Sequence, residues 1–233
     1  MPPFSVSVKP SATKELTAQE LAIEHWNNAP LFLAEEERYS IYPWLYEVAE
    51  FRKHRGHSVL EVGCGTGCDL LQFAKHGAHA FGIDVTPEHI RLARQRLGTA
   101  GEILFGDATA IPFAASTFDY VYSHGVLHHS DRPEKIVQEI IRVLRPGGRF
   151  NVHVYSMISY FTLWSILRHG RDWKRWIENS RDPVYIELYT ARKLRRLFAP
   201  IVVETHKYHS KVFFEPCLGW FLVVKGTKPY EHA

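Results

Sequence analysis

The chain has 233 residues, enough for one α/β domain of ordinary size but too few for two. Hydrophobic residues make up 45% of it, which is normal for a globular protein and excludes wholesale disorder. The net charge of +3 comes from 28 basic and 25 acidic residues, too weak a balance to favour duplex nucleic acid as a partner. The three cysteines, Cys64, Cys68 and Cys217, lack a second Cys/His pair at zinc spacing, so we expect reduced thiols and no metal. No apolar run approaches the length of a membrane span, and we expect a cytoplasmic protein without a transmembrane segment.

The first 50 residues differ in pattern from the rest of the chain. They read as helices and are rich in aromatic side chains, among them Trp26, Tyr42 and Trp44. We expect residues 1–50 to form a helical N-terminal cap over the active site and residues 51–233 to form the main domain. Packing of these rings against the sheet is an equal alternative to their lining a cleft.

From His57 onward, strand-like and helix-like segments alternate. This pattern predicts an α/β fold with a mostly parallel seven-stranded sheet and helices on both faces. The expected strands are His57–Val62, Ala78–Ile83, Glu102–Phe105, Phe118–Ser123, Arg149–Tyr155, Ile201–His209 and Gly219–Lys225. The expected helices are Cys68–Lys75, Pro87–Leu97, Pro133–Leu144 and Ala191–Phe198, and Pro146-Gly147-Gly148 is expected to turn the chain after the third of them. An insertion after the fifth strand, residues 156–189, is rich in tryptophan and basic residues, and we expect it to act as a lid.

The first expected strand runs directly into a glycine-rich loop. The segment Val59–Gly67 reads Val-Leu-Glu-Val-Gly-Cys-Gly-Thr-Gly, and the three glycines let a ligand approach the backbone N–H groups closely. Because a helix follows at once, the loop lies where open α/β sheets bind nucleotide-like ligands. The dinucleotide fingerprint would place its third glycine at Cys68, and a P-loop would need a Lys-Ser/Thr pair that this loop lacks.

Further polar positions follow the next strands. Asp84 ends the second strand, where a carboxylate can accept both hydroxyls of a ribose. Gly106-Asp107-Ala108 follows the third strand, Phe118-Asp119-Tyr120-Val121 starts the fourth, and Val143–Gly148 precedes the fifth. Together with the glycine loop, these segments resemble the class I S-adenosylmethionine-dependent methyltransferases, in the branch of small-molecule and quinone-biosynthesis enzymes known as methyltransferase type 11. The resemblance covers residues 55–155.

The resemblance implies a Rossmann-like fold with S-adenosylmethionine as cofactor, S-adenosylhomocysteine as product and no metal. The residues that it implies for the methionine part and the ribose edge are Glu61, Gly63, Gly65 and Gly67, with the backbone around Ser123 and His124 at the amino end. For the adenosine it implies Asp84 on the ribose hydroxyls, Val85 against the adenine, Asp107 on the adenine amino group and the Ala108 N–H on a ring nitrogen. Simpler roles remain open, since Asp84 could cap the helix that begins at Pro87 and Asp107 could be a turn residue.

Catalytic residues are harder to predict, because methyl transfer from a sulfonium is an in-line displacement whose leaving group needs no proton. The main task of the protein is to align the reacting atoms and exclude water, and a base is needed only if the nucleophile must lose a proton. The candidate bases are His124, His128 and His129, in Ser-His-Gly-Val-Leu-His-His after the fourth strand, and of these we expect His128. Tyr155, at the end of the fifth strand, is the second expected catalytic residue. His128 could equally support the loop. Since side chains alternate along a strand, we expect His153 and Tyr155 both to line the cleft, or neither.

The expected activity is methyl transfer to an O, N or C nucleophile of a small, planar or partly apolar molecule. The alternatives are an RNA-directed methyltransferase that uses the insertion for stacking, and a module that binds the cofactor or a partner without catalysis. An NAD-type oxidoreductase is disfavoured by the glycine spacing, and the near-neutral charge disfavours nucleic acid. The simplest interpretation of the basic insertion is a solvated helix face, and an acidic group on the substrate or a peripheral contact with an anionic lipid surface remains an alternative. The sequence determines neither the acceptor nor the oligomeric state.

Overall fold

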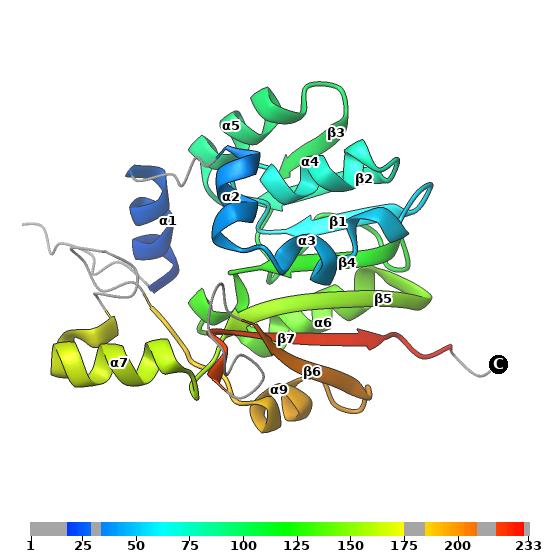
Figure 1. Ribbon diagram of the computed structural model, residues 1–233. Helices are drawn as coiled ribbons and strands as arrows, with labels where there is room; N and C mark the ends of the chain where they lie inside the picture. Colours follow the sequence, from blue (N-terminus) through cyan, green and yellow to red (C-terminus); the bar gives the residue numbers. More distant parts are fainter. Residues whose placement is uncertain (1–17, 29–33, 175–184, 209–217, 231–233) are drawn as a thin grey trace, which may run out of the picture.

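The computed structural model describes residues 18–28, 34–174, 185–208 and 218–230 (Figure 1). Within these residues lies a seven-stranded sheet with the strand order β3-β2-β1-β4-β5-β7-β6. The strands are β1 (Ser58–Val62), β2 (His79–Asp84), β3 (Gly101–Phe105), β4 (Phe118–His124), β5 (Leu144–Tyr155), β6 (Val203–Tyr208) and β7 (Phe221–Thr227). β7 is antiparallel to β5 and β6, whereas the other neighbouring pairs are parallel. The predicted mostly parallel α/β sheet is confirmed.

Helices cover both faces of the sheet. One face carries α2 (Glu35–Ile41), α3 (Leu45–Val48), the 3-10 turn η1 (Phe51–Lys53), α4 (Cys68–Lys75) and α5 (Pro87–Leu97), and the other carries α6 (Pro133–Val143) and α9 (Ala191–Leu197). The edge where the parallel strands end carries α1 (Ala18–Asn28), η2 (Leu127–His129), α7 (Tyr160–His169) and η3 (Gly170–Asp172) (Figure 1). None of the described helices combines the length and the apolar composition that a membrane crossing requires.

Alternation along the strands creates an apolar layer on each face. Leu60 of β1 and Val121 of β4 pack in the layer under α6 and α9. Val59 and Tyr122, from the same two strands, pack instead with Phe51 of η1 in the layer under the N-terminal helices. Each of these side chains is fully buried, which stabilises the fold by about 1.5–3 kcal/mol per large apolar residue.

Apart from β5, the limits of the predicted strands and helices agree with the structure to within about two residues. α4 and α5 have the expected bounds, but β5 begins at Leu144 rather than at Arg149. Leu144 already pairs with Phe118, and after a register shift Arg149 pairs with Tyr120. The segment Pro146-Gly147-Gly148 is therefore an irregular part of the strand and not a separate turn before it.

Two predicted segments are only partly described. Of residues 1–50, predicted to form a cap, the structure describes α1, α2 and α3, while residues 1–17 and 29–33 lie outside the described residues. The expected lid contains α7 and η3, but Arg175, Trp176 and Arg181 lie outside them as well, as does Cys217.

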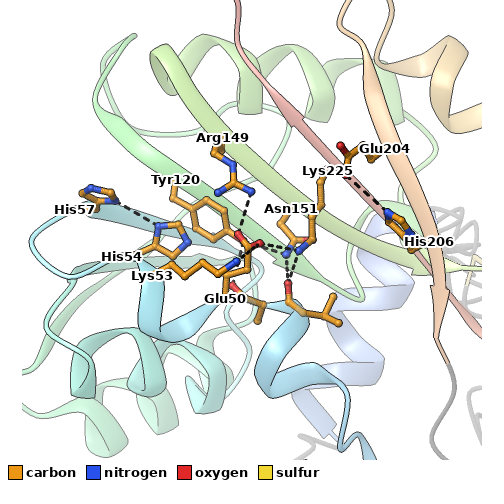
Figure 2. A network of polar contacts seen from close by, with 12 residues as sticks. Glu50, Lys53, His54, His57, Tyr120, Arg149, Asn151, Glu204, His206 and Lys225 are labelled. Atoms are coloured by element: carbon orange, nitrogen blue, oxygen red, sulfur yellow. Dashed lines mark hydrogen bonds and ion pairs between the residues drawn. The ribbon is translucent and has the colours of Figure 1, made fainter.

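A buried acid joins the N-terminal helices to the sheet (Figure 2). Glu50 follows α3 and has a left-handed backbone with φ 64°. Its carboxylate accepts hydrogen bonds from Lys53 and Lys225, each at 3.2 Å, and forms an ion pair with Arg149 at 3.2 Å. Burial raises the pKa of Glu50, but these cations outweigh it and hold that pKa below its usual value. The ionised carboxylate therefore ties the end of α3 to β5 and β7.

We expect Glu50→Gln to lower the free energy of unfolding by about 2 kcal/mol at neutral pH, because the cations lose a charged acceptor. Since the folded-state pKa of Glu50 is lowered, its contribution is present above the unfolded value near 4.5 and is lost as the pH falls through the folded value. Urea unfolding of both proteins across this pH range measures the effect. The matched control is Glu204→Gln, because Glu204 is 79% exposed and pairs weakly with His206 at 3.8 Å. Equal stability of wild type and Glu50→Gln at neutral pH would contradict the assignment.

Candidate functional site

A cavity of about 280 Å³ lies at the edge of the sheet where β1, β2 and β4 end. Of the residues predicted to bind the cofactor or to act in catalysis, those that line it are Glu61, Gly63, Gly65, Asp84, Val85, Asp107, Ala108, His124 and Tyr155. Ile23 and Trp26 of α1 and Arg38 of α2 line it as well. The cavity is therefore enclosed between the strand ends and the N-terminal helices.

The glycines of the loop after β1 have different tasks. All three have positive φ values, a conformation that glycine adopts without strain. A Cβ on Gly65 would meet no atom within 4 Å, so this glycine leaves open space on the cavity wall. On Gly67 a Cβ would come within 2.6 Å of Leu97, so this glycine permits close packing of α4 on α5 and does not line the cavity.

The two aspartates that follow β2 and β3 both line the cavity. Asp84 is buried and accepts hydrogen bonds from the backbone N–H groups of Gly65 and Thr86, each at 2.9 Å. Burial raises the pKa of Asp84, but the nearby His89 and these N–H groups lower that pKa by more than burial raises it. The carboxylate is therefore ionised. The Oδ1 atom of Asp107 accepts from the Thr109 N–H at 2.7 Å, which forms the turn after β3. Asp84 thus fixes the glycine loop as well as facing the cavity.

Asp69, at the start of α4, fastens the N-terminal helices to the site. It is buried, and Arg38 of α2 donates to its two carboxylate oxygens at 2.6 and 2.5 Å. The hydroxyls of Tyr39 and Tyr122 donate to it at 2.9 and 3.0 Å. Burial raises the pKa of Asp69, but these donors outweigh it and the pKa is lowered. Arg38 is therefore paired with this carboxylate.

Glu61, at the end of β1, lies beside Asp69 but has no cation of its own. It is 3% exposed, and its Oε2 atom has no hydrogen-bond partner among the described residues. Burial raises the pKa of Glu61 well above its usual value, and the charges of Asp69 and Asp84 add to this effect against the opposing charge of Arg38. A buried acid without a partner is costly. A ligand that brings a cation or a hydrogen-bond donor to this wall would remove that cost.

The helix α1 covers the cavity from the side opposite the strands. The Trp26 ring lies 6.4 Å from the His89 ring of α5 and 5.9 Å from the His129 ring of η2, centroid to centroid. The Asn27 side chain accepts a hydrogen bond from the Glu88 N–H, in the first turn of α5, at 3.2 Å. These contacts connect α1 to both flanks of the cavity.

One wall of the cavity is aromatic. Tyr42, Tyr155 and Phe221 line it together with His124. The Phe221 ring stacks on His124 with a centroid distance of 4.7 Å, and Tyr42 meets Phe221 edge-on at 5.6 Å. Flat aromatic walls favour planar or partly apolar molecules.

A chain of hydrogen bonds determines which nitrogen of His124 carries the proton. Asn151, shown in Figure 2, donates a hydrogen bond through Nδ2 to the Val48 carbonyl at 2.7 Å. Its Oδ1 atom is therefore the acceptor in the 2.9 Å hydrogen bond with His153 Nε2. Burial lowers the pKa of His153 and of His124 well below the usual value, so both rings are neutral. His153 Nδ1 then accepts from His124 Nδ1 at 2.9 Å. The Nε2 atom of His124 is left as a hydrogen-bond acceptor on a ring that lines the cavity.

Two predicted residues support the walls and do not line the cavity. His128 is fully buried, and its ring stacks on Tyr155 with a centroid distance of 3.7 Å. Neither ring nitrogen of His128 has a partner within the described parts of the chain. Burial lowers the pKa of His128 well below its usual value, and the neighbouring His129 and His124 lower it further. The buried hydroxyl of Ser123 donates to a carbonyl of β1, that of Val62, at 2.9 Å.

The expectation that His153 and Tyr155 behave alike is wrong. Tyr155 lines the cavity, whereas His153 is fully buried beneath His124. Both side chains point to one face of β5, but the His124 ring covers His153 and leaves only Tyr155, at the end of the strand, exposed to the cavity. Phe221 and Arg38 were not predicted as site residues, because no local motif surrounds them. Asp69 was missed as well, although it follows the glycine loop directly.

The cysteines Cys64 and Cys68 are buried and line the cavity. Burial raises the pKa of Cys68 to about 11, with a further contribution from Asp69, and raises that of Cys64 well above its usual value. Among the described residues, no three His, Cys, Asp or Glu side chains gather as metal ligands would.

Comparison with known proteins agrees with these features. A family model of a methyltransferase domain matches residues 60–152, which run from β1 to β5. The O-methyltransferase rstn1 of Aspergillus nomiae is 39% identical over 104 residues, which cover 42% of this chain and 46% of that protein. The ubiquinone/menaquinone biosynthesis C-methyltransferase of Roseobacter denitrificans is 37% identical over 111 residues, 44% of each protein. The chain therefore spans less than half the length of these curated relatives.

A solved structure extends the likeness beyond the matched segment. The [4+2]-cyclase SpnF superposes with a TM-score of 0.67 over 92% of this chain and 97% of that one, at 17% identity. This likeness concerns the fold alone, and proteins named for different reactions share the fold. The family model, the sequence relatives and the Rossmann-like sheet agree: residues 60–152 match a methyltransferase domain, and the chain is similar to class I S-adenosylmethionine-dependent methyltransferases.

Proposed function

We propose that the protein transfers a methyl group from S-adenosylmethionine to a small, planar or partly apolar molecule. The observation that carries this proposal is the unpartnered carboxylate oxygen of Glu61 in the cavity wall. The amino acid end of the cofactor carries an ammonium group, which supplies the missing donor. The open space at Gly65 and the ionised carboxylate of Asp84 suit the ribose. When bound, the cofactor supplies an electrophilic methyl group whose sulfur leaves without protonation.

The charge of the cavity disfavours a phosphate-bearing cofactor. Glu61, Asp69 and Asp84 all contribute to the wall around the glycine loop, and Arg38 is paired with Asp69. A pyrophosphate at this place would lie among carboxylates with no unpaired cation from these residues. A zwitterion with a sulfonium fits the same charges better.

We assign the proton acceptor of the reaction to His124 in place of His128, because His124 lines the cavity and His128 is fully buried. A hydroxyl that attacks a methyl carbon must lose its proton as the new bond forms. Because burial lowers the pKa of His124, its Nε2 lone pair takes that proton only as the new bond to the methyl carbon makes the hydroxyl strongly acidic. His153 and Asn151 hold the ring in the required tautomer. Tyr155 and Phe221 position the flat acceptor, and His128 supports Tyr155 from behind.

We expect Asp84→Asn to weaken the binding of S-adenosylhomocysteine by at least about tenfold, because the ribose hydroxyls lose a charged acceptor. Isothermal titration calorimetry measures the affinity, and thermal melting checks that the variant is folded. Glu204→Gln removes an exposed carboxylate that does not line the cavity, and this variant should bind as wild type does. An unchanged affinity in a folded Asp84→Asn protein would overturn the cofactor assignment.

We expect His124→Phe to lower kcat about a hundredfold with phenolic acceptors, because the variant keeps an aromatic ring against Phe221 but has no lone pair for the proton. Production of S-adenosylhomocysteine with a panel of phenols, catechols and quinols measures the rate, and calorimetry should give an unchanged cofactor affinity. Acceptors that are already ionised at the assay pH should lose far less activity. An equal loss for ionised and protonated acceptors would assign a structural role to His124, and no turnover by wild type with any acceptor would favour the non-catalytic alternative.

A further inference from the structure

The helix α7 presents its apolar side to solvent and its polar side to the protein. Tyr160, Leu163, Trp164 and Leu167 are exposed at positions i, i+3, i+4 and i+7, so they form one face, with Leu167 86% exposed. Soluble helices normally have the opposite orientation. We call these four residues, with the exposed Met157 and Ile158 before the helix, the apolar face of α7.

Hydrogen bonds fix this orientation. Ser159 accepts from the Thr162 N–H at 3.0 Å and so caps the helix, and the Thr162 hydroxyl donates to the Ser156 carbonyl at 2.9 Å. The side chains of Ser159 and Thr162 are buried. On the same inner side, Phe161 packs against Trp220 with a centroid distance of 4.7 Å. Rotating α7 to bury its leucines would break these contacts, so the exposure of the apolar face belongs to the fold.

The charges around α7 indicate what can cover this face. Arg168 and Arg171 are exposed at the C-terminal end of the helix, and neither forms an ion pair with any described residue. The segment 156–174 carries Arg168, Arg171 and Lys174 against one carboxylate, Asp172. A second copy of the chain docked through the same face would therefore bring more cations than carboxylates to the two arginines. A surface that is both apolar and anionic complements this face better.

We infer that the apolar face of α7 docks on an anionic lipid bilayer, with its leucines and aromatic rings in the interface and Arg168 and Arg171 on the lipid phosphates. Aromatic and leucine side chains beside basic residues are typical of helices that lie in the membrane interface. α7 lies at the edge of the sheet that carries the cavity (Figure 1). Trp220 connects the two, because it stacks on the cavity residue Tyr155 and meets Phe161 of α7 edge-on. A bound membrane thus lies beside the cavity. This inference rests on the surface of α7 and does not depend on methyl transfer.

The test is co-sedimentation of the full chain with vesicles of phosphatidylcholine, with and without phosphatidylglycerol. We expect binding to the anionic vesicles only, weakened by salt. The double variant Leu163→Glu/Leu167→Glu should lose at least about tenfold in binding, because carboxylates replace the side chains that enter the interface. Arg168→Glu/Arg171→Glu should lose the preference for anionic lipid. The control is Val202→Glu, since Val202 is an equally exposed apolar residue, 91% exposed, in the loop before β6.

Several results would overturn the inference. They are no binding to either vesicle, equal binding to both, and binding that the Leu163→Glu/Leu167→Glu variant retains. Light scattering could give a further result that overturns the inference. If wild type forms a dimer that this double variant abolishes, and wild type does not bind vesicles, the face would belong to the contact with a second copy of the chain. Circular dichroism and cofactor affinity confirm that each variant is folded, and both should match wild type.

Discussion

The ion pair of Arg38 with Asp69 determines the electrostatics of the site. Three buried acids, Glu61, Asp69 and Asp84, lie near one another at the ends of β1 and β2 and the start of α4. Arg38 arrives from α2 and neutralises one of them, and His89 with two backbone N–H groups stabilises another. Of the three, only Glu61 has a carboxylate oxygen without a hydrogen-bond partner among the described residues. Burying an ion pair gives little net stability. Its consequence here is that this wall of the cavity holds more acidic groups than cations.

The N-terminal helices do more than cover the cavity, because their backbone also orients a side chain inside it. The Val48 carbonyl at the end of α3 fixes the amide of Asn151, which fixes the tautomer of His153 and through it that of His124. The carbonyl of Ala49 accepts a hydrogen bond from the Tyr120 hydroxyl in the same cluster. Glu50, the next residue, is anchored by its contacts with Lys225 and Arg149 (Figure 2). The position of α3 and the chemistry of His124 are therefore coupled through buried, directional bonds.

The parts of the site that follow from local sequence could be predicted, and those that depend on packing between distant segments could not. The glycine loop, Asp84 and Asp107 stand directly after strands, and parallel strands end at one edge of a sheet, so their convergence follows from the alternation of elements. Arg38 and Phe221 come from opposite ends of the chain, and no spacing rule connects them with residues 60–152. The different fates of His153 and Tyr155 show the limit of alternation, which gives the face of a side chain but not what covers it. His128 stands in a conspicuous motif, yet its neighbours in space bury it.

The thiols of Cys64 and Cys68 lie in the same wall as the acids, and burial keeps both in the protonated form. Sulfur attacks carbon electrophiles as the thiolate and only slowly as the neutral thiol. The proposed cofactor is an alkylating agent, so a protein that binds it in this cavity must avoid modifying its own sulfur atoms. The burial and the neighbouring acids that raise the pKa of both thiols also suit a sulfonium. One arrangement of charge would then both bind the reagent and protect the protein from it.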